Sequence, residues 1–266
     1  MSDSVNNDGV VLAIDGGVAR ITLDRADVGN AIDLPLANAL HRAAITCETD
    51  PSIRCVVITG KGRLFCAGGD IGTMSSAGDR LPEVLGELIT ALHSAVARLA
   101  KMPKPLLTLI NGPAAGAGMS LALLGDVVLS ARSAHYTAAY GAIGLTADGG
   151  LSWLLPRLVG LRKAQEIILT NRRIKADEAE AIGLVTRAVD DETLETEGAV
   201  LAARLADAPV AAVGAARALL AESFQTGFEA QLGHELGSMV GAADSSEVRE
   251  GIAAFLAKRP PNFRGV

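Results

Sequence analysis

The chain is poor in aromatic residues and carries no excess of basic ones. Phe, Trp and Tyr make up 3% of its 266 residues, whereas hydrophobic residues as a whole make up 49%. The core must therefore be built from Ala, Leu, Val and Ile, which suits helices packed over a buried sheet. Asp and Glu outnumber Lys and Arg by 30 to 24, for a net charge of −6. This balance provides no basic field for nucleic acid, although a few local basic residues could still hold a phosphate.

Cysteine is scarce and unevenly spaced. The three cysteines, Cys47, Cys55 and Cys66, form no C-x-x-C pair, and two of them lie in apolar runs. An odd number of thiols in such runs is typical of reduced, buried cysteines, which predicts a cytoplasmic protein. The first eight residues are polar and acidic and do not resemble a signal peptide.

One long stretch lacks charged residues. Pro105–Gly125 is 21 residues without a charge, but it contains Asn111, Pro113 and four glycines. It divides into a strand-like piece, Leu106–Ile110, and a small-residue helix, Gly116–Leu124. Neither piece is long enough for a membrane-spanning helix. We therefore expect a strand, a turn and a buried helix, and no membrane span.

The first half of the chain alternates between strand-like and helix-like segments. Asp15-Gly16-Gly17 separates two apolar runs and predicts a β-hairpin. Helices are expected where apolar residues recur at helical spacing, over Leu36–Cys47 and Leu81–Leu99. Strands are expected over Val10–Ile14, Val18–Leu23, Cys55–Thr59, Leu106–Ile110 and Val127–Ala131. This alternation predicts an α/β fold with βα units around a mostly buried sheet.

After about Pro156, helical patterns dominate the chain. A short apolar run, Leu184–Val189, interrupts them, and Ala-rich helices follow over residues 192–258. Helix breaks are expected at Ala208-Pro209, Gly233, Gly237 and Gly241. We place a soft boundary near residue 200, between a core of residues 1–200 and a helical region of residues 201–266. The helices of this second region are expected to pack on their own core or on a neighbouring subunit.

Two glycine-rich segments could together bind an anion. The first, Phe65-Cys-Ala-Gly-Gly-Asp70, follows a strand, and its glycines let the backbone turn sharply and expose N–H groups. The second, Asn111-Gly-Pro-Ala-Ala-Gly-Ala-Gly-Met-Ser120, opens a helix, where the dipole favours negative charge. If both sets of amides face one point, they form an oxyanion hole. Taken alone, each segment is equally an ordinary strand-to-loop turn.

Taken together, these segments resemble those of the crotonase superfamily, the enoyl-CoA hydratases and isomerases. The resemblance covers nearly the whole chain, because matching segments recur in the family's order and spacing. They are Leu23–Ala31, Phe65–Met74, Asn111–Ser120, Gly144–Pro156 and Phe255–Phe263. The resemblance implies an α/β crotonase fold, with a β-β-α spiral core and a helical C-terminal region used for trimerisation. It also implies an acyl-CoA substrate, a homotrimer or dimer of trimers, and no metal or separate cofactor.

By the same resemblance, the oxyanion amides are those of Gly69 and Ala117, which hold the thioester oxygen as it becomes an enolate. The family usually has glycine at position 117, but only the N–H group is needed. Trp153 is expected to wall the acyl pocket. Further positions are expected to contact the substrate and its CoA end: Asp27, Val28, Ala67, Asp70, Ile71, Ser120, Tyr140, Phe255 and Lys258. In the family, the last two often come from a neighbouring subunit. Lys258 is otherwise a solvated helix-end lysine, and Trp153 an ordinary core residue.

Two positions depart from the family's hydratases, which place glutamates over the bound acyl chain. Ser120 and Tyr140 stand there in this chain, and neither side chain is a useful base near neutral pH. Asp148 matches the aspartate that isomerases of the superfamily use as acid and base, although Asp-Gly is also a common turn pair. We therefore predict an enoyl-CoA isomerase. A hydratase acting by an atypical route and a non-catalytic acyl-CoA-binding protein are the alternatives.

Other candidate sites have weaker support. Cys66 lies in the first glycine segment, but no base can be assigned to it. Gly118-Met-Ser120-Leu-Ala122 is only a degenerate nucleophile elbow, and no triad partners can be assigned. Gly116-Ala-Gly118 lacks the third glycine of a dinucleotide-binding motif. The four histidines show no metal-ligand spacing.

Overall fold

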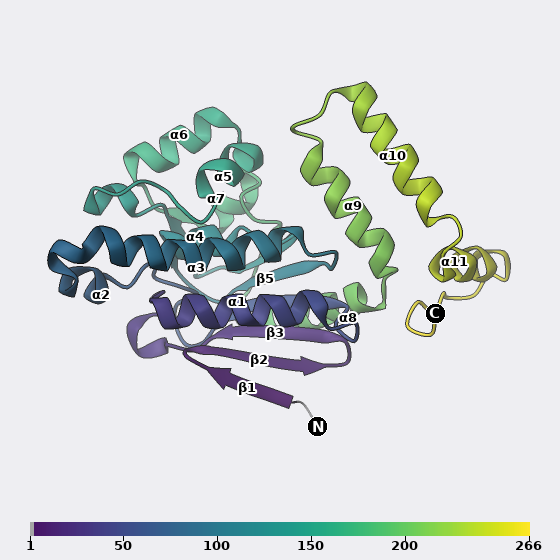
Figure 1. Ribbon diagram of the computed structural model, residues 1–266, viewed down its shortest axis with the longest axis horizontal. Helices are drawn as coiled ribbons and strands as arrows, with labels where there is room; N and C mark the ends of the chain where they lie inside the picture. The colour runs from purple at the N-terminus through teal and green to yellow at the C-terminus, as the bar shows by residue number, and fades with distance from the viewer. Residues whose placement is uncertain (1–2) are drawn as a thin grey trace.

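A seven-stranded sheet runs through the core of the computed structural model, which describes residues 3–266 (Figure 1). Its strand order is β1-β2-β3-β4-β5-β7-β10. The strands are β1 Asp3–Asn7, β2 Val10–Asp15, β3 Val18–Leu23, β4 Cys55–Gly60, β5 Leu106–Ile110, β7 Val127–Ala131 and β10 Arg187–Val189. Strands β1 to β3 are antiparallel neighbours, whereas β3, β4, β5, β7 and β10 pair in parallel. The parallel pairs require crossover connections.

Helices supply these connections and cover the sheet. Helix α1 (Leu34–Thr49) lies against β2 and β3, and α3 (Leu81–Lys101) packs beside α1 (Figure 1). Helix α8 (Leu194–Asp207) packs across β3, β4, β5 and β7. Strands β4 and β5 are buried along their whole length, which explains why they read as unbroken apolar runs.

A second, smaller sheet completes the spiral. Its order is β6-β8-β9, formed by β6 Ala114–Ala115, β8 His135–Thr137 and β9 Ile174–Lys175. Strand β5 is followed by β6 and α4 (Ala117–Ala122), and β7 by β8, η3 (Tyr140–Ile143) and α5 (Leu151–Val159). A strand in the large sheet, a strand in the small sheet and a helix thus recur along the chain. This is the predicted β-β-α spiral core.

The predicted elements of the first half are found with small shifts of their ends. The hairpin forms between β2 and β3, and its two loop glycines have φ values of +53° and +79°, as a type I′ turn requires. The short strands of the second sheet were not predicted, because two or three residues show no period. Strand β1 was missed because its sequence is polar.

The C-terminal region differs from the prediction in one helix. Helices α9 (Val210–Glu222), α10 (Phe228–Ala242) and α11 (Ser246–Leu256) follow α8, with the expected break at Ala208-Pro209. The breaks expected at Gly233, Gly237 and Gly241 are wrong, because α10 runs through all three. A glycine in a helix costs only about 0.5–1 kcal/mol relative to alanine. The boundary predicted near residue 200 falls inside α8, which is continuous.

Helices α10 and α11 extend away from the core (Figure 1). Helix α10 has no buried residue within the described chain, and α11 buries only Ala254. Exposed apolar side chains therefore gather on this region: Phe224, Phe228, Leu232, Leu236, Met239, Val240, Ile252, Phe255 and Leu256. Across residues 3–266 no single helix is long and apolar enough to cross a membrane. Only α8 and α9 together reach that length and composition, and they bend by 102° at the break between them.

Candidate active site

The glycine turn Phe65–Asp70 presents a free amide to a cavity. Ile32 donates its N–H to the Gly68 carbonyl (2.7 Å), and its own carbonyl accepts the Asp70 N–H (2.9 Å). In such a parallel bridge, the residue between the two bonded groups directs its own N–H the opposite way. That residue is Gly69, which lines the cavity. Among residues 3–266, no group accepts a hydrogen bond from its N–H.

The second free amide belongs to Ala117, the first residue of α4. Gly116, with a φ of +52°, precedes it as the N-cap residue. The N–H at the first helical position has no acceptor within its helix, and no other group of the described chain accepts it. Ala117 lines the same cavity as Gly69. The structure therefore brings the two predicted oxyanion amides to one cavity.

Glycines let the turn and the helix approach this closely. A Cβ atom on Gly118 would lie 2.3 Å from the carbonyl oxygen of Cys66. On Gly68, which has a φ of +99°, it would lie 2.8 Å from the carbonyl oxygen of Ala115. Both distances are shorter than any van der Waals contact allows. The two backbones can therefore pack together only where both positions lack a side chain.

The cavity has a volume of about 360 Å³ and mostly apolar walls. Helix α2 (Ile71–Ser76), helix α3 and the loop after η3 supply most of them. The apolar lining residues include the predicted Ala67 and Ile71, together with Met74, Leu85, Leu88, Ile89, Leu92, Ile143 and Leu145. Asp148 and Tyr140 are the titratable side chains among its lining residues. The cavity thus combines two amide donors, an apolar wall and one carboxylate.

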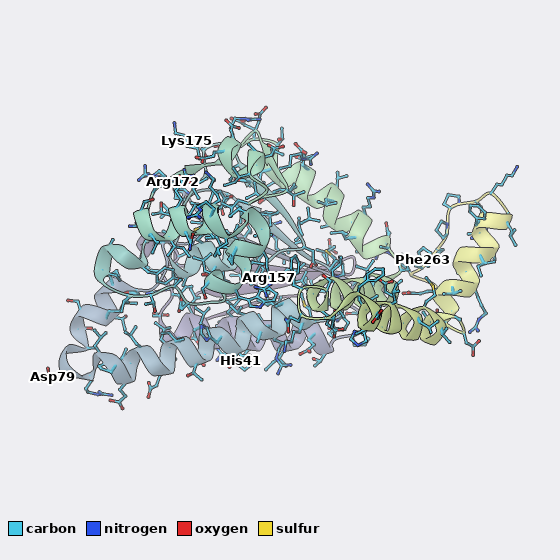
Figure 2. All side chains as sticks on the ribbon, turned by 90° about the horizontal axis from the view of Figure 1, so that it is seen from above. His41, Asp79, Arg157, Arg172, Lys175 and Phe263 are labelled. Atoms are coloured by element: carbon cyan, nitrogen blue, oxygen red, sulfur yellow. The ribbon has the colours of Figure 1, made fainter. Side chains whose placement is uncertain are left out.

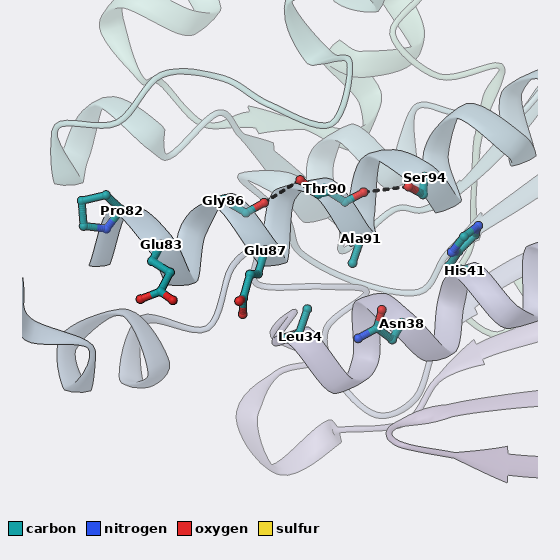
Figure 3. Close-up of a pocket in the computed structure, with 10 residues that line it drawn as sticks. All are labelled: Leu34, Asn38, His41, Pro82, Glu83, Gly86, Glu87, Thr90, Ala91 and Ser94. Atoms are coloured by element: carbon teal, nitrogen blue, oxygen red, sulfur yellow. Dashed lines mark hydrogen bonds between the residues drawn. The ribbon is translucent and has the colours of Figure 1, made fainter. Parts of the chain in front are cut away.

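A larger and more open groove of about 700 Å³ lies elsewhere, between α1 and α3 (Figure 3). Glu83 and Glu87 of α3 and Leu34 and Asn38 of α1 are among its lining residues. It shares no lining residue with the cavity and contains none of the predicted site residues. We therefore place the candidate site in the smaller cavity.

Asp148 is held by Ser120 and Tyr140. The Tyr140 hydroxyl donates to Asp148 Oδ1 at 2.5 Å. Ser120 Oγ donates to the Asp148 carbonyl at 2.9 Å and lies 3.2 Å from the Tyr140 oxygen. Burial, and then the Asp148 charge, raise the pKa of Tyr140 above that of a free phenol. Tyr140 therefore stays protonated and acts as a hydrogen-bond donor to the carboxylate.

Asp70 is not among the residues that line the cavity. Its carboxylate caps α2 by accepting the Thr73 N–H at 3.1 Å and pairs with Arg25 at 3.2 Å. The Thr73 N–H, together with Arg25, holds the pKa of Asp70 below its usual value. Arg25 also contacts Asp33, the N-cap residue of α1, at 3.1 Å. Arg25 thus joins two helix starts beside the glycine turn, a role that no local sequence signal predicts.

Trp153 does not line the cavity. Its ring is stacked by Arg157, 3.9 Å from the ring centroid, and the side chain is 43% exposed. Arg157 also lies 5.6 Å from the ring of Phe224, where the core meets the C-terminal helices (Figure 2). Trp153 thus lies outside the lining of this cavity, and its role at the acyl chain stays a prediction.

The residues predicted for the CoA end fall into two groups. Asp27 and Val28 lie in η1 (Ala26–Val28), directly before Gly29, whose carbonyl accepts the Ala67 N–H at 2.9 Å. They are therefore close to the glycine turn. Phe255 of α11 is 84% exposed, and neither it nor Lys258 lines the cavity. Helix α11 lies at the opposite end of the molecule from α2, which lines the cavity (Figure 1). Figure 2 shows the same separation between Asp79, which follows α2, and Phe263, which follows α11.

Cys66 is not available as a nucleophile. Its thiol is fully buried and donates to the Asn30 carbonyl at 3.1 Å. Burial raises the pKa of Cys66 to about 12, so the reactive thiolate is absent near neutral pH. Within residues 3–266, no cluster of three or more His, Cys, Asp or Glu side chains is placed to hold a metal ion.

Comparison with known proteins shows which family this chain belongs to. The enoyl-CoA hydratase/isomerase family model matches residues 13–266. The chain is 37% identical over 253 residues to a 1,2-epoxyphenylacetyl-CoA isomerase from Escherichia coli (strain K12), covering 95% of this chain and 97% of that protein. It is 40% identical over 260 residues to a probable enoyl-CoA hydratase from Rhodobacter capsulatus, covering 95% and 96%. The crystal structure of an enoyl-CoA hydratase from Polaromonas sp. JS666 matches with a TM-score of 0.91 at 33% identity, covering 95% and 98%. The chain therefore belongs to the enoyl-CoA hydratase/isomerase family and has the crotonase fold.

Proposed function

We propose that this member of the family is an enoyl-CoA isomerase that moves a carbon–carbon double bond by 1,3-proton transfer. The observation that supports this is a cavity with two free amide donors and a single carboxylate, Asp148. The two positions where family hydratases carry glutamates, Ser120 and Tyr140, both hold Asp148 instead. Water addition needs a group to orient and deprotonate water, whereas double-bond migration needs one base that takes and returns a proton.

The reaction begins when Asp148 removes a proton from C2 of a 3-enoyl-CoA. The electron pair of the broken C–H bond moves into the thioester, and negative charge collects on the carbonyl oxygen. The Gly69 and Ala117 N–H groups stabilise this dienolate. The carboxylic acid then returns the same proton to C4, the C2–C3 double bond forms, and the carbonyl is restored. The product is the 2-enoyl-CoA, with no net change in atoms.

Tyr140 leaves one Asp148 oxygen for this transfer. Because the phenol donates to Oδ1, we assign the proton transfer to Oδ2. The carboxylate is therefore held at one oxygen and can take the proton at the other.

The CoA end is bound, in our proposal, by backbone groups of Asp27 and Val28 and by Phe255 and Lys258 of a neighbouring copy. Because α11 lies at the opposite end of the molecule from α2, which lines the cavity (Figure 1), Phe255 and Lys258 are more easily supplied to it by another copy. The exposed apolar side chains of α10 and α11 support a trimer or a dimer of trimers. Light scattering coupled to size-exclusion chromatography measures this mass directly. The free, buried cysteines support a cytoplasmic location.

The function is tested by offering 3-enoyl-CoA and 2-enoyl-CoA to the purified protein and to Asp148→Asn. We also include 1,2-epoxyphenylacetyl-CoA, because one relative is named as its isomerase. We expect double-bond migration, lowered by about 10²–10⁴-fold in Asp148→Asn, and unchanged in Asp79→Asn, an exposed control. Hydration of 2-enoyl-CoA that survives Asp148→Asn would contradict the mechanism. Tight binding without turnover of any of the three would favour the non-catalytic alternative.

A further inference from the structure

His93 connects helix α3 to the loop that carries Asp148. Its Nε2 accepts the N–H of Gly149, the residue after Asp148, at 3.0 Å. Nε2 can accept a hydrogen bond only when it carries no proton, so the ring proton lies on Nδ1. Nothing in the sequence pointed to this role, since the histidine stands alone on an amphipathic helix.

The peptide unit between Asp148 and Gly149 is held at both of its polar ends. Ser120 Oγ of α4 donates to the Asp148 carbonyl at 2.9 Å, and His93 of α3 accepts the Gly149 N–H. Gly149 is buried with a φ of +59°, and a Cβ atom there would lie 2.9 Å from Ser120 Cβ. The peptide is therefore confined between two helices. Any rotation of it would turn the Asp148 side chain, which starts from the same backbone.

The same helix also walls the cavity. Leu88, Ile89 and Leu92 of α3 line it, and His93 follows directly after Leu92. The hydrogen bond between His93 and Gly149 thus links the helix that walls the cavity to the residue that follows Asp148.

We propose that His93 is a positioning residue for Asp148, acting through the Gly149 amide. This inference rests on the proposed function, because it assigns Asp148 as the acid and base. His93 is not among the residues that line the cavity, so its effect is on orientation. Misplacement of a reacting group by about 1 Å lowers rates by about 10²-fold. Loss of the acceptor should therefore lower kcat while leaving KM nearly unchanged.

Two variants separate the acceptor from the bulk of the side chain. His93→Leu removes the acceptor, and we expect kcat to fall by about 10- to 100-fold with KM within about twofold of wild type. His93→Gln places an amide oxygen where Nε2 stands and should restore most of kcat. Thermal unfolding of both variants checks that the fold is intact. A kcat in His93→Leu equal to wild type, or a His93→Gln variant as slow as His93→Leu, would overturn the inference.

Hydrogen exchange of the Gly149 amide tests the clamp without any substrate. We expect faster exchange over residues 148–150 in His93→Leu and wild-type exchange in His93→Gln. Unchanged exchange in His93→Leu would refute the clamp, whatever reaction the enzyme catalyses. Failure of double-bond migration in the wild-type protein, with the exchange difference intact, would instead refute the proposed function and leave the clamp supported.

Discussion

Ala117→Pro should remove one oxyanion donor and little else. Ala117 is the first residue of α4, a position at which proline is well tolerated because the N–H has no partner in the helix. The ring takes the place of an amide hydrogen that no other group of residues 3–266 accepts. Loss of one such donor weakens transition-state stabilisation by about 2.7–4 kcal/mol. We therefore expect kcat to fall by about 10²–10³-fold, with little change in the free energy of unfolding.

Gly69 offers a matched pair of variants for the second donor. A Cβ atom on Gly69 would lie 2.5 Å from Met74 Cε, which is the free end of a flexible side chain and can move. Gly69→Ala adds this contact but keeps the N–H, whereas Gly69→Pro adds bulk at the same place and removes the N–H. The ratio of their kcat values therefore isolates the amide. We again expect about 10²–10³-fold between them.

Both pairs are measured by the rate of double-bond migration together with thermal unfolding. Ala117→Gly, which keeps the N–H, serves as the control for Ala117→Pro. A folded Ala117→Pro variant with kcat within threefold of Ala117→Gly would refute the oxyanion assignment. So would equal kcat values for Gly69→Ala and Gly69→Pro. A rise in KM alone would show that these amides bind the substrate no better at the transition state than in its ground state.

Three further predictions concern Tyr140, the three thiols and Arg217. Tyr140→Phe removes the 2.5 Å donor that orients the Asp148 carboxylate. Since misplacement of a reacting group by about 1 Å lowers rates by about 10²-fold, kcat should fall by about 10- to 100-fold, and an unchanged kcat would contradict the role of Tyr140. Burial raises the pKa of all three thiols to about 12, so a thiol reagent at pH 8 should label none of them in the native protein and all of them after denaturation. Arg217→Met removes an ion pair with Asp126 at 2.7 Å and a hydrogen bond to the Lys104 carbonyl at 2.7 Å. The free energy of unfolding, measured in urea, should fall by about 1.5–3 kcal/mol, and an unchanged value would contradict the role of Arg217 in holding α9.

The core could be predicted from sequence because local pattern and global packing agree there. Strands β4 and β5 read as apolar runs because helices cover both faces of the sheet. The prediction for α10 was wrong, because Gly233, Gly237 and Gly241 suggest helix breaks in the sequence but lie within one continuous helix. The short strands β6, β8 and β9 could not be found, because their pairing depends on segments far away in sequence.

The two glycine segments of the candidate site could be recognised in the sequence because a close approach of two backbones requires glycine. The adjacent glycines of the turn and the glycines of the α4 segment marked the two places where backbone had to approach backbone. Side-chain partners were not predictable in the same way. Arg25 and His93 act on residues 45 and 56 positions away, and no local pattern encodes such distances. The catalytic roles of Gly69, Ala117 and Asp148 stay predictions until the variants are measured.

Ser120 and Tyr140 help to explain why one carboxylate is enough in the proposed reaction. Three carboxylates within hydrogen-bond distance would repel one another, and at least one would have to bind a proton. In this chain the two hydroxyl groups donate toward Asp148 instead, one to its side chain and one to its carbonyl. Ser120 is only 2% exposed and its proton is already directed at that carbonyl, so it is poorly placed to deprotonate water. Under the proposed mechanism, Ser120 and Tyr140 thus supply the hydrogen bonds that orient the single base, which is the arrangement that a proton shuttle between C2 and C4 requires.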